Sequence, residues 1–322
     1  MDIMNGIESN GESNKGQSGL TNLGNTCYLN AAVQILSHIH ELNNYLINVK
    51  QLNRTNDSVL TIEWISLYKL MWSQNCIISP NRFVSKIKEL SHNKNTKFCN
   101  FEQNDSNEYF YFMLDCIHNS LNKLDVSIKL KKTNNSELNK EIDNYESKDC
   151  SIVHSLFSSF LSYTYINKET NAVEFIKYEP HFMIELSIPL VDNISIEDCI
   201  NFTFQEETLD TLWYDEKTKE NKKLLKKTNI SYYPNILVFH LKRWIQLKKN
   251  KQVVHYNEIL NLDQKYELFG IINHEGNIFG GHYYSYIKKN KWFVFNDTNI
   301  SEIQLDDIVS DKNYCLFYRK IK

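Results

Sequence analysis

The 322-residue sequence has no CxxC pair, no signal peptide and no long apolar run. Its seven cysteines are odd in number and widely spaced, a pattern that favours reduced thiols over a disulfide scaffold. We therefore expect an intracellular protein of the cytoplasm, the nucleus or both. Closely spaced cysteine pairs are common ligands of structural zinc, so we also expect no metal and no cofactor.

The sequence also lacks an excess of either charge. Its formal net charge is −3 and its isoelectric point is near 6.4, so no basic field directs it to nucleic acid or to an anionic membrane. No apolar run approaches the roughly 20 residues that span a bilayer. Hydrophobic residues make up 42% of the chain, which is enough for a large core. We expect a monomer with neither a nucleic-acid nor a membrane partner.

The residue pattern changes along the chain in four steps. Residues 1–18 are polar and rich in glycine, serine and asparagine, so we expect a disordered tail. Residues 19–121 carry apolar side chains largely at helical spacing. Residues 122–149 are charged and asparagine-rich with little periodicity, which predicts a long surface loop or insertion. Residues 150–322 are patterned mainly as strands, and helices followed by strands indicate an α+β fold.

A single cysteine, Cys27, lies between a Gly-Asn-Thr turn signal and a helical pattern. Asn25 or Thr26 can cap the first helical turn with a side-chain oxygen. The positive end of the helix would stabilise a thiolate at Cys27. Asn22, five residues earlier, offers a carboxamide donor for an oxyanion. Taken alone, such a cysteine is more often a small buried core residue, so the nucleophile hypothesis requires a base.

His282 is the candidate base because it opens a strand whose hairpin partner ends in a carboxamide and a carboxylate. A two-residue turn at Lys289 and Asn290 puts His282 opposite Asp297. A shift of register by one step puts it opposite Asn296 instead, and the sequence leaves this choice open. Either residue accepts a hydrogen bond from one ring nitrogen and leaves the other to face a thiol.

Two other histidines are weaker candidates for the base. His274 also lies near glycine, but no strand brings an orienting group to it. His240 lies inside an apolar strand, where a satisfied core residue is the simpler interpretation. His282 alone would equally suit a half-exposed strand next to a polar turn. The residues by themselves therefore leave its pairing with Cys27 open.

Five segments resemble, in order, the sequence boxes of the ubiquitin-specific proteases, which are papain-like deubiquitinases. The segments are GLTNLGNTCYLNAAVQ from residue 19, QNDSNEYFYFMLD from residue 103, PNILVFHLKRW from residue 234, YELFGIINHEG with GGHYYSYI and KWFVFND between residues 266 and 297, and NYCLFYRK from residue 313. The resemblance covers residues 19–322. A single box could arise by chance, whereas five in the family's order identify the chain as a member of this family.

The resemblance implies an α+β, papain-like cysteine protease fold of the thumb, palm and fingers type. The catalytic domain would cover residues 19–322, with a thumb at about 19–121, a charged insertion at about 122–149, and fingers and palm at about 150–322. Many relatives bind zinc in the fingers through two CxxC pairs. Here the corresponding hairpins contain no cysteine, so the fingers must be short or held by packing.

The resemblance also assigns roles to individual residues. Cys27 matches the family's nucleophile, His282 its base and Asn22 its oxyanion-hole side chain. Asn296 occupies the place of the residue that orients the base, and Asp297 is expected to share or support that role.

Three further positions match residues that bind substrate in the family. Asp105 and Glu108 match acidic residues that hold the arginine-bearing tail of ubiquitin. Tyr283 matches the aromatic residue beside the narrow channel for its Gly-Gly end.

The predicted function is therefore hydrolysis of the isopeptide, peptide or thioester bond after the C-terminal glycine of ubiquitin, with ubiquitin and ubiquitinated proteins as partners. Three alternatives remain open from the sequence. The first is another Cys-His-Asn/Asp enzyme, such as an acyltransferase or a transglutaminase. The second is a protease for a ubiquitin-like modifier, and the third is a ubiquitin-binding pseudo-protease.

Overall fold

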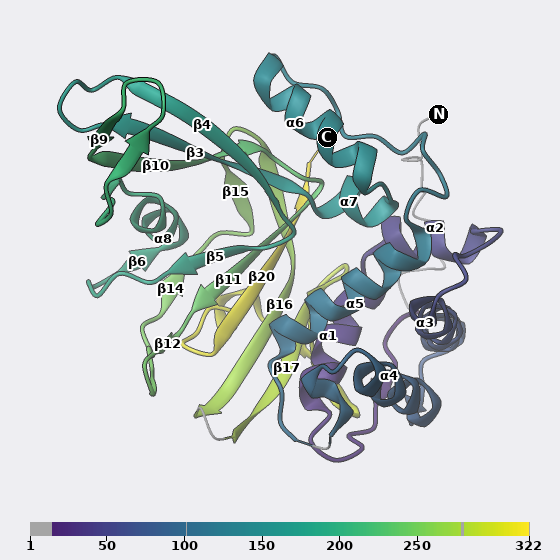
Figure 1. Ribbon diagram of the computed structural model, residues 1–322. Coiled ribbons are helices and arrows are strands. Elements are labelled where there is room, and N and C mark those ends of the chain that lie inside the picture. Colours follow the sequence, from purple (N-terminus) through teal and green to yellow (C-terminus); the bar gives the residue numbers. More distant parts are fainter. Residues whose placement is uncertain (1–14, 101, 278–279, 322) are drawn as a thin grey trace.

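The computed structural model describes residues 15–100, 102–277 and 280–321. In Figure 1 a helical layer packs on one side of a central sheet, and a second, elongated sheet extends away from both. The helices are α1 (Cys27–Ser37), α2 (His40–Asn48), α3 (Asn56–Ser73), α4 (Asn81–Asn93), α5 (Ser106–Leu121), α6 (Ser136–Lys148), α7 (Ile152–Phe157) and α8 (Ile196–Thr203), with 3₁₀ turns η1 (Lys97–Cys99) and η2 (Leu305–Asp307).

The central sheet has eight strands in the order β19-β18-β17-β16-β20-β11-β5, with β15 also paired to β16. All of its neighbours are antiparallel except β11 and β5. The strands are β5 (Ile184–Ser187), β11 (Ile236–Lys242), β15 (Ile259–Asn261), β16 (Lys265–Asn277), β17 (Gly280–Lys288), β18 (Trp292–Asn296), β19 (Asn299–Ile303) and β20 (Asn313–Lys320). Side chains alternate between the two faces of this sheet, so it carries one hydrophobic core on each side.

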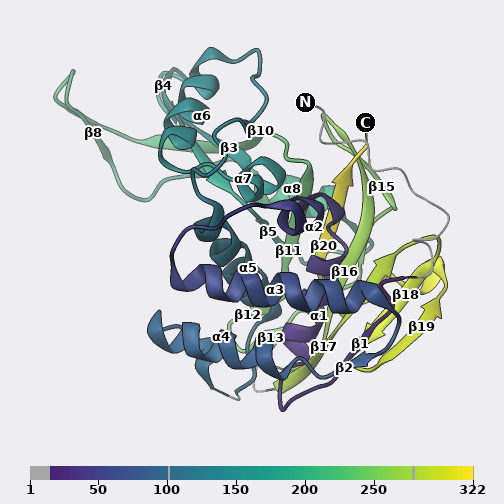
Figure 2. The same ribbon diagram turned by 90° about the vertical axis from the view of Figure 1, so that its right-hand side faces the viewer.

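The elongated sheet has the order β4-β3-β10-β7 and lies at the upper left of Figure 1. A short hairpin of β8 and β9 stands near its far end (Figure 2). These strands are β3 (Ser159–Asn167), β4 (Val173–His181), β7 (Glu207–Thr208), β8 (Trp213–Asp215), β9 (Glu220–Lys222) and β10 (Leu224–Tyr232). The predicted hairpin around a Lys-Glu-Thr turn is confirmed, because β3 and β4 pair antiparallel.

Three small strand pairs complete the fold. They are β1 (Gly19–Leu20) with β2 (Ile77–Ile78), β12 (Trp244–Ile245) with β13 (Lys248–Lys249), and β6 (Ile194–Ser195) with β14 (Val254–His255).

Helix α1 is the centre of the molecule. All of its residues are buried, because it packs on β16, β17 and β18 on one side and on α5 on the other. Helices α3 and α4 lie side by side farther out, as Figure 2 shows. The buried residues of α1 include the polar side chains of Asn30, Gln34 and Ser37. The first residue of α1 is Cys27, so the fold places this thiol between the helical layer and the sheet.

Two expectations about segments are wrong in part, namely disorder at residues 15–18 and a loop throughout residues 122–149. The tail expected at residues 1–18 lies partly outside the described residues, but residues 15–18 pack on the end of α3. Ser18 is fully buried and donates from its hydroxyl to the carbonyl of Met71 at 2.9 Å. The segment 122–149 is not a loop throughout, because it contains α6, whose Leu138 and Ile142 form a small core with Phe160.

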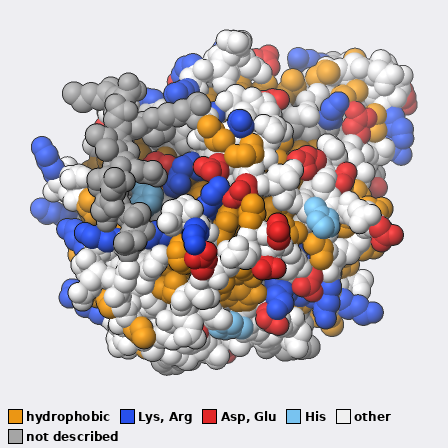
Figure 3. Space-filling model, turned by 180° about the vertical axis from the view of Figure 1, so that it is seen from behind, with side chains coloured by type: hydrophobic (Ala, Val, Ile, Leu, Met, Phe, Trp, Pro, Cys, Tyr) orange, Lys and Arg blue, Asp and Glu red, His pale blue; other side chains and the backbone are white. Residues whose placement is uncertain are grey.

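The visible surface carries mixed charges. On the face drawn in Figure 3, Lys and Arg side chains are interspersed with Asp and Glu wherever the described residues are seen. No helix of the described residues is long and apolar enough to cross a bilayer.

Candidate active site

Cys27 begins α1 with only 4% of its surface exposed. Thr26 is the N-cap residue of the helix, but it makes no side-chain capping hydrogen bond. Its hydroxyl instead accepts from the backbone N–H of Leu23 at 2.8 Å. The expectation of a capping side chain at Thr26 is therefore wrong. The first-turn N–H groups of α1 keep their positive field for the thiol, which favours a thiolate there.

His282 lies on β17 between two partners. Its Nε2 is 2.6 Å from Asn296 Oδ1, and an amide oxygen only accepts, so Nε2 donates. Nδ1 is then the ring nitrogen left to face Cys27, and the interaction with this thiol is the largest influence on the pKa of His282. That interaction raises the pKa of His282 to about 9; burial opposes the rise and the Asn296 bond adds to it. The ring is therefore protonated at neutral pH.

The hairpin that carries these residues has neither of the two registers considered from the sequence. Lys288 pairs with Trp292, so the turn has three residues rather than two. Continued outward, this register places Thr298 opposite His282. The last pair of the ladder is Ser285 with Phe295, and the imidazole reaches Asn296 diagonally beyond it.

Asp297 does not touch the imidazole but holds Asn22. The Oδ1 atom of Asn22 accepts from the backbone N–H groups of Gly24 and Thr26, each at 3.1 Å. Its Nδ2 donates to Asp297 Oδ2, also at 3.1 Å. Asn22 itself is exposed, so the second hydrogen of its amide is accessible to a substrate. The structure thus separates two neighbouring residues: Asn296 accepts from the His282 imidazole, and Asp297 accepts from the Asn22 amide.

Two residues of the site were not singled out from the sequence. Asn30 on α1 donates from Nδ2 to Asp297 Oδ1 at 2.7 Å. Tyr314 on β20 donates its hydroxyl to Asp105 Oδ2 at 2.5 Å. Both lie inside recognised boxes, so the signal was present, but only the folded chain shows which acidic side chain each one meets.

Asp105, Glu108 and Tyr283 meet where α5 begins. Asp105 is the N-cap of α5, and its Oδ1 accepts from the backbone N–H groups of Asn107 at 2.8 Å and Glu108 at 3.2 Å. Its Oδ2 also accepts from the Tyr283 hydroxyl at 3.3 Å. Glu108 is exposed and forms an ion pair with Lys97. The Asp105 carboxylate is therefore already engaged within the protein.

The two rival histidines lie apart from the thiol. His274 is 3% exposed and burial lowers its pKa to about 4, so its ring is neutral at neutral pH. Its Nδ1 is 3.2 Å from the Lys249 ammonium, and burial lowers the pKa of that lysine to about 8. His240 lies 3.7 Å from Glu185 on the neighbouring strand β5. Within the described part of the chain, no hydrogen bond joins either imidazole to Cys27.

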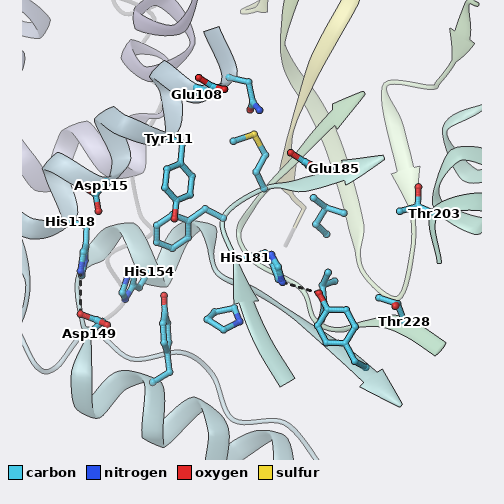
Figure 4. A pocket seen from close by; sticks show the side chains of 18 of the residues that line it. Glu108, Tyr111, Asp115, His118, Asp149, His154, His181, Glu185, Thr203 and Thr228 are labelled. Carbon is cyan, nitrogen blue, oxygen red and sulfur yellow. Dashed lines mark hydrogen bonds and ion pairs between the residues drawn. The ribbon is translucent and has the colours of Figure 1, made fainter. Parts of the chain in front are cut away.

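A large open cavity lies beyond α5, between the helical layer, the central sheet and the elongated sheet. Its volume is about 1010 Å³. Figure 4 shows Tyr111, Asp115 and His118 along one wall, with Glu185 and His181 across from them. The rings of His118 and His154 stack at 4.0 Å, and Glu108 stands at the rim nearest Asp105.

Ion pairs join the far end of the elongated sheet to the β8–β9 hairpin. The Lys222 ammonium lies 2.9 Å from Glu174 and 2.7 Å from Asp215, and so links the β3–β4 hairpin with the β8–β9 hairpin. Among the described residues no group of three or more His, Cys, Asp and Glu side chains could hold a metal ion.

Comparison with known proteins points in the same direction as this geometry. The chain matches the ubiquitin carboxyl-terminal hydrolase family over residues 18–318. It is 29% identical to ubiquitin carboxyl-terminal hydrolase Usp2 of Drosophila melanogaster, over 97% of this chain and 36% of that protein. It is 28% identical to ubiquitin carboxyl-terminal hydrolase 2 of Bos taurus, over 96% of this chain and 56% of that protein. The chain thus spans between a third and a little over half of these relatives.

The fold has close counterparts among solved structures. One is the SAGA Ubp8/Sgf11/Sus1/Sgf73 DUB module bound to ubiquitin aldehyde, with a TM-score of 0.76. The match covers 98% of this chain and 72% of that one at 21% identity. The α+β fold of the ubiquitin-specific proteases, expected from the sequence boxes, is confirmed.

Proposed function

The chain belongs to the ubiquitin carboxyl-terminal hydrolase family, and on this premise we propose that it is a thiol-dependent deubiquitinase. It cleaves the isopeptide, peptide or thioester bond after the C-terminal glycine of ubiquitin. The observation that carries the proposal is the triad of Cys27, His282 and Asn296. The thiol begins a helix, its interaction with the imidazole raises the pKa of His282, and Asn296 Oδ1 lies 2.6 Å from the ring Nε2. Such a triad carries out nucleophilic acyl transfer.

The first step is attack by the Cys27 thiolate on the carbonyl carbon of the ubiquitin C-terminal glycine. The positive end of α1 and the His282 imidazolium stabilise the thiolate. Asn296 keeps Nε2 as a donor to its amide oxygen, so the Nδ1 proton points toward the reacting atoms.

The negative charge that develops on the carbonyl oxygen is bound by Asn22 and the Cys27 backbone N–H. Asn22 suits this role because two N–H groups and one carboxylate fix its amide while its side chain remains exposed. A preorganised donor of this kind is typically worth about 10²–10³ in rate.

The proton on His282 Nδ1 moves to the departing lysine nitrogen, so the amine leaves neutral and a thioester remains on Cys27. The now neutral imidazole removes a proton from water, whose oxygen attacks the thioester. A second oxyanion forms and collapses, which releases the ubiquitin carboxylate and regenerates the thiolate and imidazolium pair.

The protein binds ubiquitin at two places, its globular body and its C-terminal tail. The cavity beyond α5 takes the body, and the tail passes Asp105, Glu108 and Tyr283 on its way to Cys27. Glu108 is exposed at this entry and can exchange Lys97 for an arginine of the tail. Asp105 already caps α5 and binds Tyr283 and Tyr314, so it acts chiefly by shaping the channel.

The expected organisation of the chain is part of the same proposal. The thumb would comprise about residues 19–121, and the fingers and palm about residues 150–322. All seven cysteines are free, which suits an intracellular monomer of the cytoplasm, the nucleus or both.

Cleavage of ubiquitin dimers tests this function. Wild type should convert isopeptide-linked ubiquitin dimers to monomers, and Cys27→Ala and His282→Ala should not, because each lacks one half of the acyl-transfer pair. Turnover by Cys27→Ala near the wild-type rate would refute the mechanism. A need for calcium or an acyl-CoA donor would point instead to the transglutaminase or acyltransferase alternative.

A further inference from the structure

Asn30 lies one turn after Cys27 on α1 and is 2% exposed. Its Nδ2 donates to Asp297 Oδ1 at 2.7 Å and lies 3.3 Å from the carbonyl oxygen of Leu20. A carboxylate only accepts hydrogen bonds, so the contact with Asp297 fixes which way the Asn30 amide faces. The residue therefore links the nucleophile's helix to the turn that follows Asn296.

The other end of the Asn30 amide has no partner. Its Oδ1 is buried without a hydrogen bond from any described residue. A buried acceptor left in this state costs stability, and such atoms are rare in folded proteins. In this orientation the Asn30 amide donates to Asp297, while its own oxygen has no hydrogen-bond donor among the described residues.

Asn43 shows what a purely structural buried asparagine looks like in this chain. It is fully buried, donates to the carbonyl of Leu36 at 2.7 Å and accepts from the Trp64 indole N–H at 3.0 Å. Both ends of its amide are satisfied, and it lies in the helical layer with no contact to the site. Asn30 differs on both counts.

Within the described residues, Asp297 is hydrogen-bonded by three residues of the segment around Cys27. It forms the turn between β18 and β19 with φ at +50°, a conformation that non-glycine residues seldom adopt. Its backbone oxygen accepts from Leu20 N–H at 2.8 Å, its Oδ2 from Asn22 and its Oδ1 from Asn30. If Asn30 is lost, the carboxylate can rotate and Asn22 loses its fixed acceptor.

We propose that Asn30 is a positioning residue for the hydrolysis. Through Asp297 it fixes the direction of the Asn22 amide, and so sets the oxyanion donor before substrate arrives. This inference rests on the proposed function, because it assumes that Asn22 stabilises an oxyanion. It differs from a role in holding the base, since His282 is oriented by Asn296 and has no contact with Asn30 in the described structure.

Steady-state hydrolysis of ubiquitin with a fluorogenic C-terminal amide tests the proposal. Asn30→Leu keeps the size of the side chain and removes its donor. We expect kcat to fall about 10- to 100-fold, somewhat less than for loss of an oxyanion donor itself, with KM within about threefold of wild type. The pH dependence of kcat/KM should keep its basic limb, because His282 keeps both partners. Asn43→Leu is the matched control and should lower stability but leave kcat of the folded protein near wild type.

The decisive comparison is the double variant Asn22→Ala/Asn30→Leu. Because Asn30 acts through Asn22, the double variant should be no slower than Asn22→Ala alone. A structural role would instead give losses that multiply.

Exchanging the donor and the acceptor between positions 30 and 297 provides a second test in case Asn30→Leu does not fold. Asn30→Asp places two carboxylates face to face and should lower kcat most. Adding Asp297→Asn restores one donor and one acceptor between the two positions and still offers an oxygen to Asn22. We expect the swapped double variant to recover at least tenfold in kcat over Asn30→Asp alone.

The outcomes separate the two levels of the argument. An active wild type with full kcat in Asn30→Leu, multiplicative losses with Asn22→Ala, or no recovery in the swap would overturn the role of Asn30 alone. A folded wild type that leaves the ubiquitin substrate intact would overturn the proposed function, and the role of Asn30 with it.

Discussion

The imidazole of His282 has a different partner on each nitrogen, and this asymmetry determines how the site responds to pH. The bond to Cys27 raises the pKa of His282 to about 9, and the bond to Asn296 adds to the rise. A group whose pKa is raised in the folded protein stays protonated until the pH rises through that value. The acid that must protonate the leaving amine is therefore present throughout the neutral range.

The pH profile of kcat/KM should have a basic limb near pH 9, where the imidazolium is lost. Asn296→Ala removes a bond that raises this pKa, so the limb should move to lower pH, and kcat should fall about 10²-fold or more as the ring loses its orientation. Asp297→Ala should lower kcat with a smaller shift of the limb, since it acts mainly on Asn22. Initial rates from pH 5 to pH 10 measure both effects. An equal shift in the two variants would contradict the division of roles between them.

The sequence identified Cys27 and His282 because their boxes are local and distinctive. It could not decide between Asn296 and Asp297, since that choice depends on a turn length and on a contact between residues 275 positions apart. Asn30 and Tyr314 stayed hidden for the same reason. Their functional partners are set by tertiary packing, which no local pattern encodes.

At the scale of single elements, a cluster of charged side chains joins the β8–β9 hairpin to the elongated sheet. Lys222 bridges Glu174 and Asp215, whose side chains are about as buried as its own. Hydrogen bonds from Lys222 lower the pKa of both carboxyl groups, and the same hydrogen bonds to Asp215 and Glu174 raise the pKa of the lysine. The stacked rings of Tyr165 and Phe175, with centroids 4.4 Å apart, pack in the same sheet.

Lys222→Met should loosen the β8–β9 hairpin, because it leaves two carboxylates facing each other without a cation. We expect amide hydrogen exchange of residues 213–222 to rise about tenfold or more. Exchange in α1 and β17 should not change. Lys217→Met, at an exposed position of the same hairpin, is the control. Equal exchange in the two variants would show that packing alone holds the hairpin.

Helix α6 shows where local interpretation failed. Its apolar residues Leu138, Ile142 and Tyr145 follow helical spacing, but charged and asparagine residues fill the rest of the segment and hide the pattern. A signal was nevertheless present at the start, since Asn135 caps the helix through the N–H groups of Glu137 and Leu138. For this helix, the capping residue was a better predictor than the spacing of apolar residues.

On the scale of the whole molecule, several histidines are buried in neutral form. Burial lowers the pKa of His38 to about 3 and those of His154 and His274 to about 4. An unfolded histidine titrates near pH 6.5, so below that value the unfolded chain binds protons that the folded chain does not. Stability should therefore fall as the pH drops below about 6.5. His282 acts in the opposite direction, but it is one residue against these three and His40, His118 and His181, whose pKa values burial also lowers.

His154→Phe should reduce this acid sensitivity, because it removes one of the neutral buried rings and keeps an aromatic side chain between its stacking partners His118 and Tyr145. Between pH 7.5 and pH 5 each such histidine costs about 2 kcal/mol of unfolding free energy. Denaturant titrations at the two pH values should show that difference between wild type and variant. His92→Phe, at an exposed position, should behave as wild type. An identical loss of stability in wild type and His154→Phe would rule out this explanation.

The order of the elements in the sequence, helices first and strands after, was enough to predict the α+β class. The order did not predict how the N-terminal helical half contacts the C-terminal strands. The segment of residues 19–30 binds the turn at Asp297 through Leu20, Asn22 and Asn30, and Gly19 lies so close to Thr298 that a Cβ atom would stand 2.5 Å from its carbonyl oxygen. These contacts join the ends of the sequence into one site.

The central claim is that Cys27 is the nucleophile of a deubiquitinase, and covalent capture tests it most directly. Wild type and Cys27→Ala would each be mixed with ubiquitin that carries a thiol-reactive group at its C-terminus, and adducts would be mapped by mass spectrometry. The account predicts one adduct, formed by wild type only, with ubiquitin on Cys27 and on none of the other six cysteines. A folded wild type without an adduct, or an adduct on another cysteine, would contradict it.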